Sequence, residues 1–120
     1  MNKYRSLDAW RHAHALACTA LRFADAHYSA RARPLLDQLR RAAISVEANI
    51  VEGYALSTTP YFRRHLRIAL GSAAEVECLV RLAAEVGYAS AEPARELETL
   101  CDRTIGTLRG LLRRLPARKV

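Results

Sequence analysis

Two apolar seams with helical spacing fill the middle of this sequence, and they limit its possible folds more than any other feature. In the first seam, apolar or small residues recur every third or fourth position: Leu36, Leu39, Ala43, Val46, Ile50 and Gly53. The second seam keeps the same spacing: Phe62, Leu66, Ala69, Ala73, Val76, Val80 and Ala83. A period of three and four residues is typical of helices that pack along one face. The seams therefore predict two long helices that pair with each other.

The ends of these central helices are marked by proline and glycine. Pro34 suits the first turn of a helix over residues 34–55, because its fixed φ is already helical. Thr59-Pro60 resembles an N-cap followed by a first helical residue, and Gly87 suits a left-handed C-terminal cap. The second central helix is therefore expected over residues 60–86.

Apolar stripes of the same kind lie on either side of the central pair. The first stripe predicts a helix over residues 7–28, anchored by Trp10 and N-capped by Ser6. The last stripe predicts a helix over residues 91–115, N-capped by Ser90. No strand-like alternation and no long linker occur, so we expect an all-α, antiparallel up-down-up-down four-helix bundle with one domain, residues 1–120.

The N-terminal residues lack the apolar core of a signal peptide, and no run approaches the ~18 apolar residues of a membrane span. We therefore expect a soluble, cytoplasmic protein without a membrane partner. Cys18, Cys78 and Cys101 are odd in number, lack C-x-x-C spacing and have apolar neighbours at helical spacing. They are interpreted as buried, reduced thiols, which fits a cytosolic environment.

Polar and small residues interrupt the oily faces of the two central helices: Ser45, Asn49, Glu52, Gly53, Gly71, Ser72 and Glu75. Such carboxylates near a core act either as general acid and base or as structural groups with partners. Antiparallel pairing would place Glu52 beside Arg64, Asn49 near Arg67, and Ser45 close to Gly71 and Ser72. Because ordinary partners are available, the structural interpretation of these residues is favoured.

The two glycines of this motif, and a second strip on the third helix, make further predictions about packing. Gly53 indicates either a close backbone contact or fraying toward the turn. Gly71 in mid-helix costs about 1 kcal/mol relative to alanine, and a close helix–helix crossing is the simplest compensation. A strip beside the second seam predicts neighbours on two sides of this helix: Ile68, Ser72, Glu75, Leu79, Leu82 and Val86.

Residue patterns that carry catalysis are missing from the sequence. The four histidines stand singly or on different helix faces, and neither H-E-x-x-H nor E-x-x-H pairs occur. Glycine-rich phosphate loops and the G-x-S-x-G motif are absent, and the cysteines show no obvious nucleophile context. The sequence therefore predicts a protein that is not an enzyme, with no catalytic residues, no metal and no cofactor.

The chain has 19 Lys and Arg residues against 12 Asp and Glu, a net charge of +7. Cations in the first turns of the third helix oppose its dipole, so something should offset them. A phosphate backbone or an acidic protein would do so; alternatively, the arginines only cover the bundle with their aliphatic stems. The residues proposed for a nucleic-acid surface are Arg40, Arg41, Arg63, Arg64, Arg67, Arg113 and Arg114.

Nearly the whole chain resembles the four-helix-bundle family of 23S rRNA intervening-sequence proteins, which includes Avd-like accessory proteins of diversity-generating retroelements. The matching segments are Leu7-Asp8-Ala9-Trp10 with Ala13-His14, residues 38–46 and 48–53, then Phe62, Leu66, Ile68-Ala69, Gly71-Ser72 and Glu75, and residues 82–88. The main departure is Glu47, where the family commonly has proline, so a potential kink in the second helix is removed.

The resemblance implies a ring-like homopentamer without catalytic activity, in which the shared motif residues determine packing. In Avd-like members a basic surface is thought to engage RNA and a reverse transcriptase. The leading hypothesis is a non-enzymatic, oligomeric helical scaffold that binds RNA or another nucleic acid through arginine–phosphate contacts. The alternative is an adaptor whose basic face binds an acidic protein partner, for example a reverse transcriptase.

Overall fold

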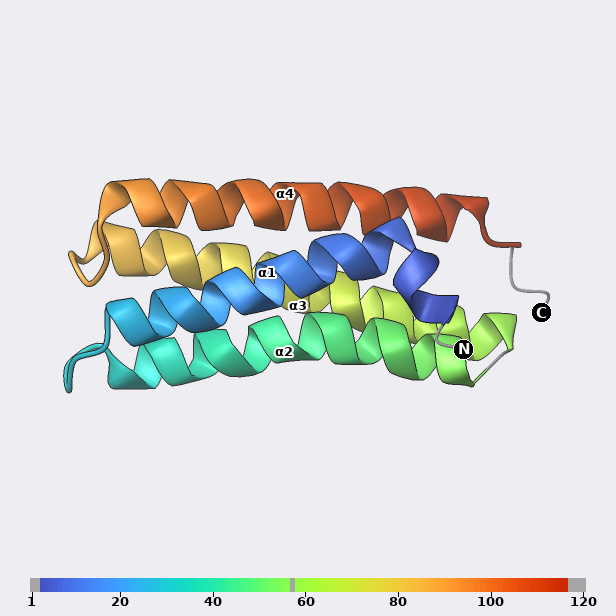
Figure 1. Cartoon of the computed structure of the whole chain (residues 1–120), viewed down its shortest axis with the longest axis horizontal. Coiled ribbons are helices and arrows are strands. Elements are labelled where there is room, and N and C mark those ends of the chain that lie inside the picture. The colour runs from blue at the N-terminus through green and yellow to red at the C-terminus, as the bar shows by residue number, and fades with distance from the viewer. Residues whose placement is uncertain (1–2, 57, 117–120) are drawn as a thin grey trace.

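The computed structural model describes residues 3–56 and 58–116 of the chain (Figure 1). A short 3₁₀ helix, η1 (Lys3–Ser6), precedes four α-helices: α1 (Asp8–Ala26), α2 (Arg33–Ala55), α3 (Thr59–Glu85) and α4 (Ala91–Arg114). The helices run alternately up and down in a rod of 46 × 28 × 21 Å. The predicted all-α four-helix bundle is confirmed. Within the described ranges, no helix combines the length and apolar character needed to cross a membrane.

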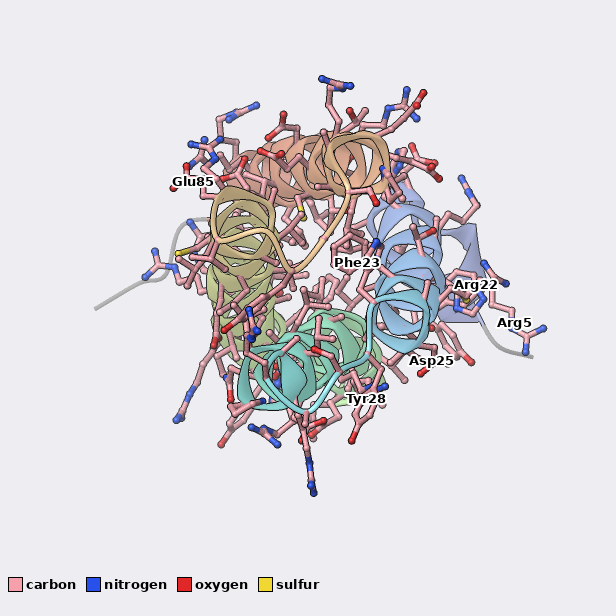
Figure 2. All side chains as sticks on the ribbon, turned by 90° about the vertical axis from the view of Figure 1, so that its left-hand side faces the viewer. Arg5, Arg22, Phe23, Asp25, Tyr28 and Glu85 are labelled. Atoms are coloured by element: carbon pink, nitrogen blue, oxygen red, sulfur yellow. The ribbon has the colours of Figure 1, made fainter. Side chains whose placement is uncertain are left out.

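Each helix packs against the two helices beside it. α2 lies between α1 and α3, and α4 closes the bundle by packing against α3 and α1. Viewed end-on, the four helices surround a common interior (Figure 2). Phe23 of α1 points into that interior, whereas Arg22, its neighbour in the chain, points away from it. This division between adjacent positions follows from the 100° step between residues of a helix.

The core is built from the predicted seams. All six residues of the first seam are buried on α2, including Gly53, and Leu66 to Ala83 of the second seam are buried on α3. Phe62 is half-buried and packs against this core. Burying a leucine, isoleucine or valine side chain contributes about 1.5–3 kcal/mol. The seams therefore supply much of the apolar burial that holds α2 and α3 together.

Two predicted N-caps are wrong by one residue. Ser6 ends η1, and Leu7 is the N-cap of α1, where it provides no side-chain hydrogen bond. The amide of Leu7 donates to the carbonyl of Tyr4 at 3.0 Å, so the 3₁₀ turn leads directly into α1. Thr58, rather than Thr59, is the N-cap of α3. Ser90 is the N-cap of α4, as predicted.

Local hydrogen bonds determine the C-terminal ends of α3 and α1. Gly87 has φ of +81°, which confirms the predicted left-handed cap. The Tyr88 amide donates to the Ala83 carbonyl at 2.8 Å, and the Gly87 amide to that of Ala84 at 3.2 Å, which is a Schellman motif. α1 ends at Ala26, two residues before the expected end, and the ring Nδ1 of His27 lies 2.9 Å from the Phe23 carbonyl.

The interpretation of all three cysteines as buried is wrong for two of them. Cys101 is buried, Cys18 is half-buried and Cys78 is exposed. α3 has neighbours on two sides, α2 and α4, as expected, but Ile68, Leu82 and Val86 of its second strip are 43%, 44% and 52% exposed. Part of the second strip therefore faces outward. For the same reason, the apolar neighbours of Cys78 in the sequence do not cover its thiol.

Candidate nucleic-acid interface

The polar residues between α2 and α3 form a hydrogen-bonded network. The Ser45 and Ser72 hydroxyls are 2.9 Å apart, and the Asn49 amide nitrogen donates to the Ser45 carbonyl at 2.9 Å and hydroxyl at 3.0 Å. The Asn49 amide oxygen, which can only accept, lies 2.9 Å from Nδ1 of His65, so this nitrogen carries the proton. The approach of Ser45 to Ser72 is confirmed, whereas the partner of Asn49 is His65 and not Arg67.

The two glycines of the motif have different surroundings. A Cβ added to Gly53 would lie 2.7 Å from Cβ of His65 and 3.1 Å from Cδ1 of Phe62, so the close-contact interpretation is correct. A Cβ added to Gly71 would meet nothing within 4 Å. The predicted close crossing at Gly71 is therefore wrong within this chain, because the residue faces outward.

The two acids of the motif, Glu75 and Glu52, also have different surroundings. Glu75 accepts a hydrogen bond from the Gln38 amide at 2.6 Å, which ties α3 to α2. Glu52 is exposed and forms no ion pair with any described residue, so its predicted pairing with Arg64 is wrong. In the same part of the chain, no group of three or more His, Cys, Asp or Glu residues is arranged to hold a metal ion.

Arg40 and Arg41 lie in the first half of α2, away from the other predicted arginines. Arg40 donates to Asp25 of α1 at 2.8 Å and to Asp37 at 2.9 Å. Its hydrogen bond to Asp25 raises the pKa of Arg40 above its ordinary value. Arg41 donates to the Gln38 side chain at 3.0 Å. Two acids thus already pair with Arg40, whereas Arg41 is exposed and forms no ion pair with any described residue.

Arg63 explains part of the unusual charge at the start of α3. Its Nη1 donates to the carbonyl of Leu112 in α4 at 3.1 Å. Because α3 and α4 are antiparallel, the first turns of α3 lie beside the last turns of α4, where carbonyl groups give a partial negative charge. The carbonyl groups at the end of α4 therefore stabilise the positive charge of Arg63, which the dipole of α3 disfavours.

A depression of about 670 Å³ lies at the start of α3, where it is lined by Pro60, Tyr61, Arg63, Arg64, Arg67 and Ile68. Arg64 and Arg67 are exposed and form no ion pair with any acid in the part of the chain that the structure describes. Tyr61 is 55% exposed. Tyr61 is not among the residues predicted from the sequence, although an aromatic residue two positions before Arg63 and Arg64 is a recognisable signal.

Arg113 and Arg114 extend the positive charge in the last turn of α4, and both are exposed. We use the term basic end for the five arginines that the structure places at one end of the rod, at the right in Figure 1: Arg63, Arg64, Arg67, Arg113 and Arg114. Guanidinium groups bind phosphate through paired hydrogen bonds, and an exposed tyrosine ring can stack on a base. The predicted surface is therefore divided, with Arg40 and Arg41 apart from the basic end.

The fold and this surface define a small helical-bundle protein with a charged end. The family described as 23S rRNA-intervening sequence protein matches residues 5–110, and the chain belongs to this family. A similar fold occurs in the crystal structure of a protein with unknown function from the S23 ribosomal protein family of Bacteroides thetaiotaomicron VPI-5482. The two chains are 21% identical with a TM-score of 0.66, over 85% of this chain and 98% of the other. Comparison with curated proteins finds no significant match.

Proposed function

We propose that this protein is a non-enzymatic, oligomeric helical scaffold of the cytoplasm that binds RNA or another nucleic acid through its basic end. The observation that carries this proposal is the depression lined by Arg63, Arg64 and Arg67 together with Tyr61. The guanidinium groups of Arg64 and Arg67 beside the exposed Tyr61 ring match the two elements of single-strand recognition, phosphate neutralisation and base stacking.

The shape of the basic end favours a flexible, single-stranded segment. The depression is open, and its lining residues come from successive turns of α3. Successive nucleotides can therefore follow α3 from Tyr61 toward Ile68. Arg63 is tied to Leu112, which leaves Arg64 and Arg67 as the cations available for phosphate contacts in the depression. These two residues are therefore the ones to test.

The experiment measures binding of unrelated single-stranded RNAs and DNAs between low and physiological salt. We expect affinity to fall with salt, with a slope of roughly 0.7 per phosphate contact on a log–log plot. The double variant Arg64→Gln/Arg67→Gln should lower both affinity and slope. The control is Arg22→Gln/Arg95→Gln, which removes the same charge from exposed arginines near the opposite end of the bundle.

The control separates a specific surface from general attraction to a basic protein. Equal losses in the two double variants would show that net charge alone binds the nucleic acid, and that the basic end is not the site. No detectable binding even at low salt would overturn the proposal and favour the adaptor hypothesis, in which the basic end receives an acidic protein.

Assembly into a homopentamer is part of the proposal, with a second copy of the chain covering the outer face of α3. Three apolar residues of this face, Ile68, Leu82 and Val86, are exposed, and the space above Gly71 is open. A crossing helix from another copy would cover these residues and explain the glycine. Light scattering at micromolar concentration tests this directly, and a strictly monomeric species would contradict it.

A further inference from the structure

A second cluster of reactive side chains lies between α1 and α2, outside the basic end. His14 and Cys18 are one helical turn apart on α1, and Glu47 of α2 faces them. Nδ1 of His14 lies 2.9 Å from Oε2 of Glu47, and Nε2 of the same ring lies 3.7 Å from the Cys18 sulfur. Glu47 lies within α2, which runs unbroken from Arg33 to Ala55 and supplies a carboxylate at this point.

The two contacts of the His14 imidazole determine which ring nitrogen can accept a proton from the Cys18 thiol. A carboxylate oxygen only accepts hydrogen bonds, so the contact with Glu47 places the proton of neutral His14 on Nδ1. Nε2 then carries the free lone pair, and this is the nitrogen that faces the Cys18 thiol. The order thiol, imidazole, carboxylate is the arrangement that activates a cysteine nucleophile.

Trp10 holds the imidazole from a third direction. Its ring stacks on that of His14 with centroids 4.9 Å apart and an angle of 17° between the planes. The stacking limits rotation of the His14 side chain. It also places the aromatic face against the imidazolium that forms when His14 takes a proton, an arrangement that stabilises the cation.

We propose that Cys18 is an activated thiol and a site of covalent modification by hydroperoxides, with His14 as its base and Glu47 as the residue that positions the base. His14 Nε2 takes the thiol proton, and the thiolate attacks one oxygen of the peroxide as the O–O bond breaks. The proton held by His14 then passes to the leaving oxygen. With hydrogen peroxide the products are a Cys18 sulfenic acid and one water molecule, so the sulfur is oxidised by two electrons and the peroxide is reduced.

The cluster is suited to proton transfer and not to binding a metal ion. The thiol and the carboxylate each face a different nitrogen of the same ring, so the imidazole lies between them and the three groups do not converge on one point. This agrees with the finding that no group of three such ligands among residues 3–56 and 58–116 can hold a metal ion.

The other two cysteines serve as internal references. Cys78 is exposed, and no hydrogen bond joins it to any described residue. Cys101 is buried, and burial raises the pKa of its thiol to about 12, which leaves it protonated near neutral pH. In the separate chain, accessibility alone predicts that Cys78 reacts first, followed by Cys18, so the comparison is made at a protein concentration at which light scattering shows no assembly through the outer face of α3. Activation by His14 predicts the reverse order.

The experiment treats the full, reduced chain with hydrogen peroxide in the presence of dimedone, which traps sulfenic acids, and follows each cysteine by peptide mass spectrometry. We expect Cys18 to be labelled about tenfold faster than Cys78, because Nε2 of His14 lies within reach of the Cys18 thiol as a base. Labelling of Cys78 at an equal or higher rate would overturn the proposal, and this comparison needs no variant.

Two variants test the roles of His14 and Glu47. His14→Gln should lower the Cys18 rate to that of Cys78, and Glu47→Gln should lower it by a smaller factor, because the amide can still accept a hydrogen bond from Nδ1. The control Arg22→Gln removes an exposed charge one turn beyond Cys18 and should leave the rate nearly unchanged. An unchanged Cys18 rate in His14→Gln would overturn the proposal.

Cys101 reports whether a variant has merely loosened the bundle. Unfolding would expose this buried thiol, so its labelling would rise in any variant that loses its structure. A fall in Cys18 labelling, with the labelling of Cys78 and Cys101 unchanged, would show that the substitution impairs proton transfer from Cys18 to His14. A rise in Cys101 labelling together with an unchanged ratio of Cys18 to Cys78 would show a structural role for the substituted residue and count against the proposal.

Discussion

The side of α3 that faces α2 differs from the side that faces α4. Toward α2, the contacts join mainly neutral groups at short distances, as between Ser45 and Ser72 or between Asn49 and His65. Toward α4, they involve charged groups: Arg81 lies 3.3 Å from Glu98, which is 27% exposed, and burial and the Asp102 carboxyl raise the pKa of Glu77.

This difference indicates which neighbour sets the position of α3. Short hydrogen bonds between neutral, partly buried groups depend on geometry. Moving either group out of position therefore lowers the free energy of unfolding. Exposed ion pairs tolerate movement and contribute little to stability. We therefore expect substitutions on the α2 side to lower the free energy of unfolding much more than substitutions on the α4 side.

The largest effect is expected from Gly53→Ala. The new methyl group would lie 2.7 Å from Cβ of His65, so α2 and α3 would have to move apart. Overpacking of this kind costs about 1–3 kcal/mol, and a backbone shift would also disturb the neighbouring bond between His65 and Asn49. Urea unfolding followed by circular dichroism measures the loss.

Gly71→Ala is the matched control, because it makes the same change in the same helix pair at an exposed position. With nothing within 4 Å of the added methyl, alanine should stabilise the isolated chain by about 1 kcal/mol. If Gly53→Ala were as well tolerated as Gly71→Ala, close packing at the α2–α3 contact would not limit stability. If Gly71→Ala weakened assembly instead, a second copy would lie against this residue.

The second prediction concerns Asn49→Ala, which removes the amide that links Ser45 to His65. The His65 Nδ1 would lose its acceptor in a partly buried position, which costs about 1–3 kcal/mol. Ser72→Ala removes a single hydroxyl contact and should cost less than Asn49→Ala. Equal losses would mean that the network acts as one unit and that Asn49 is not its central member.

The sequence predicted the helices well because their signals are local. The apolar seams, Pro34 and Gly87 placed the helices to within about two residues, which is the usual spread of helix boundaries. The N-caps failed at Ser6 and Thr59 because the hydrogen bonds of a 3₁₀ turn or of a neighbouring threonine decide which residue begins the helix.

Side-chain partners were harder to predict, since they depend on the rotation of each helix. Residues two positions apart differ by about 200° around the axis, so α3 presents His65 to Asn49 while Arg67 faces solvent. The exposure of Cys78 was missed for a related reason. An apolar strip has the same pattern whether it faces the chain's own core or another copy.

On the α4 side, Glu77→Gln should stabilise the bundle at neutral pH. Burial, followed by the Asp102 carboxyl, raises the pKa of Glu77 above its ordinary value of 4.5. The folded state therefore binds this proton more tightly than the unfolded state, and stability falls as pH rises above 4.5 through the raised pKa.

Because Glu77 is only partly covered, the gain from Glu77→Gln should be small, about 0.5 kcal/mol, which is the scale of surface charge interactions. It should disappear near pH 4, where wild-type Glu77 is protonated. Thermal unfolding at pH 4 and pH 7 provides the measurement. A gain that is independent of pH would arise from a source other than ionisation.

The smallest effect is expected for the ion pair between Arg81 and Glu98. The two side chains are 61% and 27% exposed, so water screens their attraction, and holding them together costs side-chain entropy. A double-mutant cycle with Arg81→Gln and Glu98→Gln should give a coupling of about 0.5 kcal/mol or less, falling further as salt rises. A coupling as large as the loss in Asn49→Ala would mean that α4 positions α3 as strongly as α2 does, because directional contacts on both sides would then fix the helix.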